Sequence, residues 1–257
     1  MNKNQAAFKH LWPSLLLLAV ITGMLLLVWN PYPFLQFKTN DKFSLALILT
    51  AVLTGPALTW FLYREGKWGL VFDLVVVVVI QISAITWGTY ALFQNRPYFM
   101  VFTVDRFEVL SIRDVEFTDP GQLKFLNKPV VGPIVLYANM PKDPLGFQKL
   151  LKEIMFEGKP DLQFRPEFWS LYSERQAQTL RVSKPLEALR LARPEYATTI
   201  DKLVNTHGGD IGQLNFVPGM IKDAQFAVIL DAESGEVVDT LTIDAWMGLD
   251  DDQGASE

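Results

Sequence analysis

The run Leu74-Val-Val-Val-Val-Val-Ile80 opens an uncharged stretch that continues to Asn95. Two further uncharged stretches precede it, at Leu11–Phe37 and Phe43–Tyr63. Each is close to the ~20 residues that a helix needs to cross a hydrocarbon core ~30 Å thick. None has the period-2 alternation of membrane barrel strands. We therefore predict three transmembrane helices, at about residues 11–29, 43–63 and 70–94.

Charge divides the 257 residues near the end of the third stretch. Through Arg96 the chain has seven Lys/Arg and three Asp/Glu, a balance of +4, whereas the rest has 16 basic and 25 acidic residues, a balance of −9. This split indicates a membrane region at 1–96, a water-facing domain at 97–248 and an acidic, disordered tail at 249–257. A domain with a balance of −9 is a poor nucleic-acid binder, because such binding needs a basic face.

Several kinds of chemistry are disfavoured. Cysteine is absent and the histidines are His10 and His207, so neither a thiolate nor a His-rich metal site can form. No nucleophile, phosphate-loop or dinucleotide motif occurs. His207 before Gly208 is typical of a helix end, and Asp250–Asp252 lack the other ligands of a calcium loop. We expect no enzyme activity, no cofactor and no metal.

Basic residues near the predicted spans indicate the orientation of the chain. Lys3 and Lys9 precede the first span, and the short turn Arg64-Glu-Gly-Lys67 is doubly basic, which favours the cytoplasm for both. The opposite side would have Lys38, Lys42 and Arg96. The first span is long and no A-x-A-like site follows it, so we expect an anchor rather than a cleaved signal peptide. The prediction is a multi-pass inner-membrane protein with a cytoplasmic N-terminus and a periplasmic C-terminal domain.

The C-terminal domain has the pattern of an α+β fold. Strands are predicted at Tyr98–Val104 and Glu108–Ile112, and a hairpin at Gln225–Asp231 and Glu236–Ile243. Helices are predicted to start at proline or capping signals, and they cover about 143–156, 166–180, 183–194 and 195–206.

Several different short motifs follow one another along the chain. They are Trp29-Asn-Pro-Tyr-Pro-Phe34, Gly55-Pro-Ala-Leu-Thr59, Arg64–Leu74, Arg96-Pro97, Asp105-Arg-Phe107 and Ile243-Asp-Ala-Trp246. Together they resemble the TfpX/TfpZ (FimB-like) family of type IV pilin accessory proteins. The candidate partner-contact or structural residues are Trp29, Pro31, Tyr32, Pro33, Gly55, Pro56, Thr59, Lys67, Asp73, Arg96, Pro97, Asp105, Arg106, Phe107 and Trp246.

Structural alternatives exist for these motifs. Gly55-Pro56 predicts either a packing kink or a notch in which another helix docks. Asp73 near Lys67 suggests a paired carboxylate at the membrane interface. Asp105-Arg-Phe107 suggests a salt-bridged turn or a contact surface. Arg96-Pro97 suggests a helix stop with a cation at the headgroups.

The resemblance implies a non-enzymatic, chaperone-like protein of the inner membrane that acts on a cognate type IV major pilin. It would support pilus assembly and twitching motility, in contact with the bilayer and with other pilus assembly components. The acidic domain could select a pilin head of complementary charge. One alternative is a membrane-anchored periplasmic sensor or ligand-binding protein, although the predicted cytoplasmic parts are too short for an output domain. Another is a tethered hydrolase, for which no site is recognisable.

Overall fold

A computed structural model describes residues 2–29, 34, 42–126 and 132–246 of the chain. The chain divides into two compact units, residues 1–96 with 130–132, and residues 97–129 with 133–257. We call the first the helical unit and the second the α+β domain.

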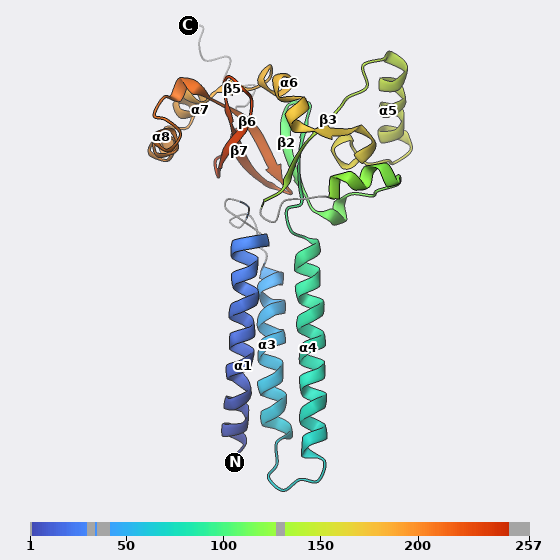
Figure 1. The fold of residues 1–257 in the computed structure, drawn as a ribbon, viewed down its shortest axis with the longest axis vertical. Coiled ribbons are helices and arrows are strands. Elements are labelled where there is room, and N and C mark those ends of the chain that lie inside the picture. The colour runs from blue at the N-terminus through green and yellow to red at the C-terminus, as the bar shows by residue number, and fades with distance from the viewer. Residues whose placement is uncertain (1, 30–33, 35–41, 127–131, 247–257) are drawn as a thin grey trace. The chain divides into compact units, whose positions relative to one another are not determined.

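Three helices make up the described part of the helical unit. α1 covers Lys3–Met24 and continues as a π-helix over Leu25–Trp29. α3 covers Lys42–Leu62 and α4 covers Leu70–Gln94. Figure 1 shows the three side by side, with α3 packed against both α1 and α4.

The prediction of three transmembrane helices is wrong. Within the described residues, two helices are long and apolar enough to cross a membrane, Lys3–Trp29 and Leu70–Gln94. The apolar stretch of α3 within the described residues is Val52–Leu62, which at 1.5 Å per residue is about 16 Å long. The uncharged run Phe43–Tyr63 was misleading because a helix that packs against other helices also lacks charge. In α3, Val52 and Thr59 are buried by such packing.

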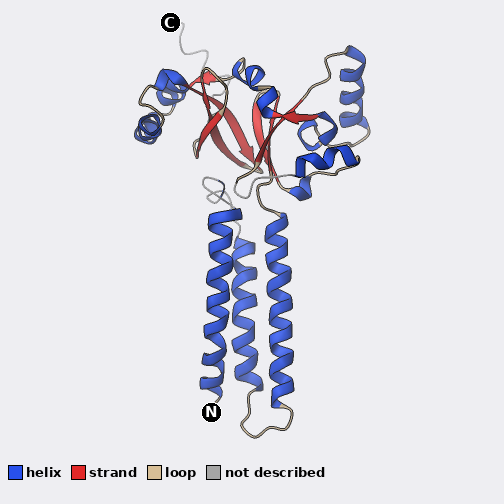
Figure 2. Ribbon diagram, viewed as in Figure 1, coloured by secondary structure: helices blue, strands red, loops and turns tan. Residues whose placement is uncertain are grey.

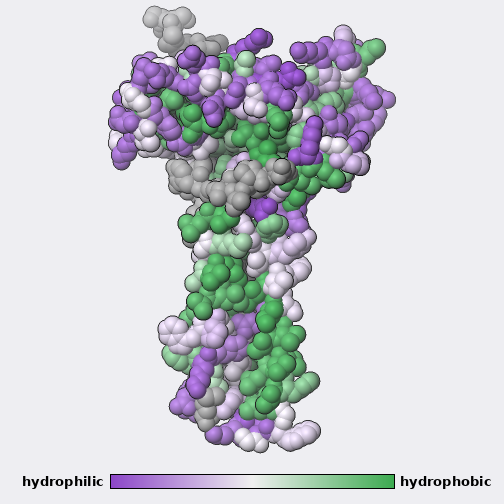
Figure 3. Space-filling model, in the orientation of Figure 1, coloured by the Kyte–Doolittle hydropathy of each residue, from purple (hydrophilic) through white to green (hydrophobic). Residues whose placement is uncertain are grey.

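The two longer helices expose their apolar side chains. Val71 and Phe72 of α4 and Leu16 and Val20 of α1 all have exposed side chains, and Figure 3 shows hydrophobic surface along the helical unit. In water such a surface would be unfavourable, whereas in a bilayer it is solvated by lipid. These two helices therefore indicate that the protein associates with a membrane.

The α+β domain is built on one mixed sheet in the order β4-β3-β1-β2-β6-β7-β8, and β5 also pairs with β6 (Figure 2). β1 and β2 form a hairpin; β1 pairs in parallel with β3, and β2 in parallel with β6. The strands are β1 Phe99–Thr103, β2 Arg106–Leu110, β3 Ile134–Ala138, β4 Trp169–Leu171, β5 Lys184–Pro185, β6 Leu214–Ile221, β7 Ala224–Asp231 and β8 Val237–Leu241.

Helices cover the sheet at two places and bury two separate hydrophobic clusters. The helices of the domain are α5 Pro144–Phe156, α6 Gln176–Leu180, α7 Leu186–Ala192 and α8 Ala197–Thr206. One cluster joins α7 and α8 to β6 and β7 through residues such as Leu189, Ile200 and Phe216. The other joins α5 to β1 and β3 through Leu150, Phe99 and Leu136.

Most sequence-predicted elements of the domain are confirmed, with two corrections. The predicted helix 166–180 is wrong: it is a 3-10 turn at Pro166–Phe168, strand β4, a second 3-10 turn and the short α6. The helix predicted from Ser183 begins only at Leu186, because the Ser183 hydroxyl donates to Leu180 O instead of capping. β3, β5 and β6 were not predicted.

Candidate functional site

Polar side chains from all three helices meet inside the helical unit. The Gln81 amide nitrogen donates to Ser14 Oγ at 2.9 Å and to the carbonyl oxygen of Val52 at 3.4 Å. Its amide oxygen lies 2.7 Å from His10 Nε2, and His10 Nδ1 lies 2.6 Å from Thr59 Oγ1. We call His10, Ser14, Thr59 and Gln81 the polar cluster.

The hydrogen bonds fix the orientation of the Gln81 amide in the polar cluster. The Gln81 nitrogen has two acceptors, so its oxygen must face His10, and His10 Nε2–H donates to it. The other ring nitrogen, Nδ1, is hydrogen-bonded to the Thr59 hydroxyl. Ser14 Oγ in turn donates to the His10 carbonyl oxygen. Satisfied polar groups of this kind join helices in an apolar medium, where an unpaired group would be costly.

The motif Gly55-Pro-Ala-Leu-Thr59 makes room for this network. A Cβ atom at position 55 would lie 1.9 Å from Gln81 Oε1 and 2.4 Å from Cδ. The Gln81 amide therefore lies directly on the backbone of Gly55, and Thr59 follows one turn later to contact His10. The sequence predicted either a packing kink or a docking notch at Gly55-Pro56. In the structure a helix is docked on Gly55, and that helix is α4 of the same chain.

Other predicted residues of the helical unit make local contacts. Trp29 is buried and its ring meets Phe93 edge to face, with centroids 5.1 Å apart. The Arg96 guanidinium lies 3.6 Å from the centre of the same Phe93 ring. Lys67 and Asp73 form an ion pair at the start of α4. Pro56 lies within α3, and Pro97 is buried just beyond α4. Pro31, Tyr32 and Pro33 lie outside the described residues.

The remaining motif residues lie in the α+β domain, at the β1–β2 turn. Arg106 contacts Asp105 at 3.4 Å and Glu108 at 2.9 Å, and its guanidinium lies 5.8 Å from the Trp246 ring centre. Phe107 is fully buried. The two distant motifs are thus brought together, and Asp105-Arg106 is a salt-bridged turn. Val104 precedes it with φ of 49°, a conformation that β-branched residues rarely adopt.

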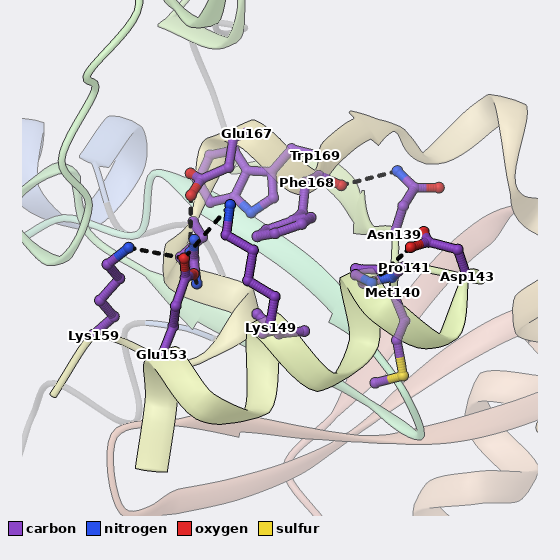
Figure 4. Close-up of a pocket in the computed structure, with 13 residues that line it drawn as sticks. Asn139, Met140, Pro141, Asp143, Lys149, Glu153, Lys159, Glu167, Phe168 and Trp169 are labelled. Atoms are coloured by element: carbon purple, nitrogen blue, oxygen red, sulfur yellow. Dashed lines mark hydrogen bonds and ion pairs between the residues drawn. The ribbon is translucent and has the colours of Figure 1, made fainter. Parts of the chain in front are cut away.

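The α+β domain also contains a cleft of about 720 Å³ beside α5 (Figure 4). One wall is α5, which begins where Asp143 accepts a hydrogen bond from Gly146 N at 2.6 Å. The other wall is the segment after β3. There the Asn139 amide donates to Phe168 O, just before β4, at 2.9 Å and to Ser170 Oγ, within β4, at 3.0 Å. Phe168 and Trp169 supply apolar surface.

Charged side chains gather at one end of the cleft. Glu153, turned inward from α5, contacts Arg165 at 2.8 Å and Lys159 at 3.0 Å. Arg165 also contacts Glu167 at 2.8 Å, and Lys149 lies 4.0 Å from Glu153. Hydrogen bonds from Lys159 and Arg165 lower the pKa of the Glu153 carboxyl. Lys159 also lies 4.0 Å from Glu157, so the three cations at this end of the cleft are paired with three carboxylates.

The cleft combines charged side chains that contact one another with the apolar surface of Phe168 and Trp169. A few polar groups placed around apolar surface are the usual composition of a ligand-binding pocket.

Sequence reasoning missed the polar cluster and the cleft. Gln81 interrupts the apolar run of α4, and an amide inside such a run is a signal of a helix contact that could have been used. Nothing in the sequence connects Glu153 with Arg165, because their pairing depends on how α5 packs beside the turn before β4.

Comparison with known proteins places the chain among proteins that build fimbriae. It is 28% identical over 200 residues to "Fimbrial assembly protein, serogroup I" of Dichelobacter nodosus, a match that covers 72% of this chain and 76% of the relative. It is 26% identical over 200 residues to the serogroup E1 protein, with the same coverage. It is 30% identical over 123 residues to the protein of serogroups C1 and C2, covering 45% of this chain and 94% of the relative. No family model matches the sequence, and no solved structure matches it.

These matches define the class as proteins of fimbrial assembly. The chain belongs to the fimbrial assembly protein family. The coarser part of the prediction, a role in fimbrial assembly, is thereby confirmed, and the resemblance to the TfpX/TfpZ (FimB-like) family in particular stays a prediction.

Proposed function

We propose that this protein is a TfpX/TfpZ-like (FimB-like) accessory that holds a cognate type IV major pilin in the inner membrane before or during pilus assembly. The observation that carries the proposal is the similarity to fimbrial assembly proteins over 72% of the chain. In this role the protein is a non-enzymatic, chaperone-like partner of the pilin, and its loss impairs twitching motility.

The helical unit supports a role beside a membrane-embedded subunit. A pilin waits in the bilayer with an apolar N-terminal helix. α1 and α4 present outward-facing apolar side chains against which such a helix can pack, among them Val75 and Val79. The polar cluster joins α1, α3 and α4 from within, so the outward face is presented by a fixed scaffold rather than by independent helices.

The distribution of charge supports a periplasmic α+β domain. The turn before α4 contains Arg64 and Lys67, and the positive-inside rule assigns such a turn to the cytoplasm. If α4 crosses the bilayer from that turn, the domain that begins at Phe99 lies on the opposite side. There it can meet the globular head of the pilin. Alkaline phosphatase fused after Trp246 would then be active, and inactivity of a stable fusion would contradict this orientation.

Deletion of the gene tests the function. We expect less pilin on sheared cell surfaces and reduced twitching, both restored by the full-length chain from a plasmid. Immunoblots of total pilin separate two mechanisms: a fall in total pilin means protection of the subunit, and unchanged total pilin without fibres means a step in assembly. Unchanged pilin, surface fibres and twitching would refute the accessory function.

A further inference from the structure

One side of α4 changes from apolar to polar along the helix. The residues of α4 that are buried are Val77, Gln81, Ile85, Gly88 and Leu92. Ser83 lies two residues beyond Gln81, about 200° around the helix, and so on the opposite side. On that side Phe72 and Val79 are exposed in the first half of α4, and four polar residues follow at intervals of three and four. We call these residues, Ser83, Thr86, Tyr90 and Gln94, the outer polar face of α4.

Two hydroxyl groups of this face are unsatisfied. Ser83 and Thr86 are exposed, and within the described part of the chain their hydroxyls make no hydrogen bond. Other hydroxyls of the helical unit are satisfied: those of Ser14 and Thr54 each donate to the carbonyl oxygen four residues earlier, at 3.1 and 2.5 Å. The groups that lack a partner are therefore found on the side of α4 that faces away from α3.

The same two hydroxyls lie deep in the apolar part of α4. Charged residues flank this part at Asp73 and Arg96. Ser83 follows Asp73 by ten residues and Thr86 precedes Arg96 by ten, so each is about 15 Å from the nearer charge. That is half of a hydrocarbon core ~30 Å thick. In a helix that crosses a bilayer, both hydroxyls lie near the centre, where water cannot satisfy them and an unpaired polar group is costly.

A second membrane helix that carries polar side chains would satisfy these groups. Serine and threonine hydroxyls both donate and accept hydrogen bonds, and small residues let two helices approach closely. A second copy of α4 is a poorer occupant, because residues 97–257, with a balance of −9, begin three residues after Gln94. Two copies paired through this end of α4 would hold two domains of like charge together. The proposed function supplies a different occupant, the apolar N-terminal helix of the pilin.

We propose that the outer polar face of α4 is the surface on which the membrane helix of the pilin docks, through side-chain hydrogen bonds to Ser83 and Thr86. Tyr90, which is 56% exposed and accepts a hydrogen bond from the Gln94 amide at 2.6 Å, extends this contact towards the end of α4. The inference rests on the proposed function and adds the helix face and the groups that recognise the pilin. These groups provide selectivity, since apolar contact alone does not distinguish a pilin helix from lipid.

Site-specific photo-crosslinking in living cells tests the site. Benzoylphenylalanine replaces Trp87, which is 69% exposed and follows Ser83 by about one turn. The matched control is Leu16 of α1, which is 70% exposed. Trp87 follows Gln81, and Leu16 follows His10, by six residues; because His10 contacts Gln81 and both helices run in the same direction (Figure 1), the two positions lie at the same level of the helical unit.

We expect an adduct with the major pilin from position 87 and none from position 16. A pilin adduct of equal yield at position 16 would overturn the proposal, because any exposed apolar position would then bind the pilin. An adduct at position 87 only with a second copy of this chain, or no protein adduct there at all, would also overturn it.

Removal of the two hydroxyls tests the chemistry. In the benzoylphenylalanine-87 background, Ser83→Ala with Thr86→Val removes both hydrogen-bonding groups with little change in size. Two hydrogen bonds between membrane helices, at their average strength, correspond to a change of about sevenfold in the binding constant, so the yield of pilin adduct should fall by about that factor. Thr54→Val is the control, because the Thr54 hydroxyl is satisfied within α3, and it should leave the yield unchanged.

A second double variant separates the loss of hydroxyls from disturbance of the helix. Ser83→Thr with Thr86→Ser retains both hydroxyls and should retain the yield, and immunoblots of membranes should show equal amounts of all variants. An unchanged yield after Ser83→Ala with Thr86→Val, or an equal loss in the variant that retains both hydroxyls, would refute the hydrogen-bonded site.

The two hypotheses can fail separately. If deletion impairs pili but both α4 tests are negative, the accessory function stands and the docking surface is wrong. If deletion has no effect on pilin, fibres or twitching, the proposed function fails whatever α4 contacts.

Discussion

Replacing Gly55 by alanine should disconnect the polar cluster. The new methyl group would lie 1.9 Å from Gln81 Oε1, so the amide must move away. In moving it loses its hydrogen bonds to His10, Ser14 and the Val52 carbonyl. The substitution should therefore act on the contact between α4 and its two neighbours, without changing any group that makes the hydrogen bonds.

The expected cost follows from the number of hydrogen bonds lost. Side-chain hydrogen bonds between helices in membranes contribute about 0.6 kcal/mol each on average, so three amount to about 2 kcal/mol. Gln81→Ala removes the same three bonds and also clears the space above position 55. Adding Gly55→Ala to Gln81→Ala should then be neutral, or stabilising by up to about 1 kcal/mol through helix propensity.

Unfolding of the full-length protein in mild detergent, followed by far-ultraviolet circular dichroism as sodium dodecyl sulfate is added, measures these free energies. Gly23→Ala in α1 is the matched control, because its Cβ would meet no atom within 4 Å. A stable Gly55→Ala variant, or a double variant that loses about 4 kcal/mol because the two costs add, would refute the coupling between Gly55 and Gln81.

Three further predictions concern the α+β domain. Burial raises the pKa of Tyr172 to about 12. Because the unfolded chain releases this proton near pH 10, the free energy of unfolding should fall by about 2–3 kcal/mol between pH 10 and pH 12. Denaturant titrations at each pH measure this fall, which Tyr172→Phe should abolish. Val104→Gly should stabilise by about 1 kcal/mol, since it relieves a β-branched residue at φ 49°, and a lower melting temperature would contradict this. Asp231 Oδ1 accepts hydrogen bonds from Ser234 N and Oγ at 2.7 and 2.8 Å. These hydrogen bonds lower the pKa of the Asp231 carboxyl. Asp231→Ala should therefore lower the free energy of unfolding by about 1–2 kcal/mol at neutral pH, and by progressively less as pH falls through that lowered pKa.

Local signals predicted the elements whose neighbours agree with them. The Asp143-Pro144 cap and the hairpin around Gly235 act within a few residues, and both are present. The predicted helix 166–180 failed because β4 pairs with β3, a contact that overrides local propensity.

β6 was hidden by Pro218-Gly219, which locally indicates a turn. The strand tolerates Pro218 because, on the side opposite β7, β5 pairs at 215–216 and β2 at 219–220. The missing N–H of Pro218 falls in the gap between them, which no local pattern could reveal.

The candidate site was less accessible to sequence reasoning than the fold. The motif Gly55–Thr59 was noticed as a pattern, but its meaning depends on Gln81 and His10, which lie on other helices. Counting uncharged residues identified α3 as a span and could not identify which of its sides contact protein. An uncharged helix that faces lipid differs from one that packs against other helices in its contacts with distant residues, and not in its composition.

The parallel pairing of β2 with β6 sets the order in which the domain can be completed. β2 ends at Leu110 and β6 begins at Leu214, so the middle of the sheet stays open until most of the chain has been synthesised. Until then β2 is an unpaired edge, which can associate with other extended chains. The hairpin β6–β7 closes that edge. A chain that stops before Leu214 should therefore aggregate or be degraded in the cell, even though every helix of the helical unit is already present.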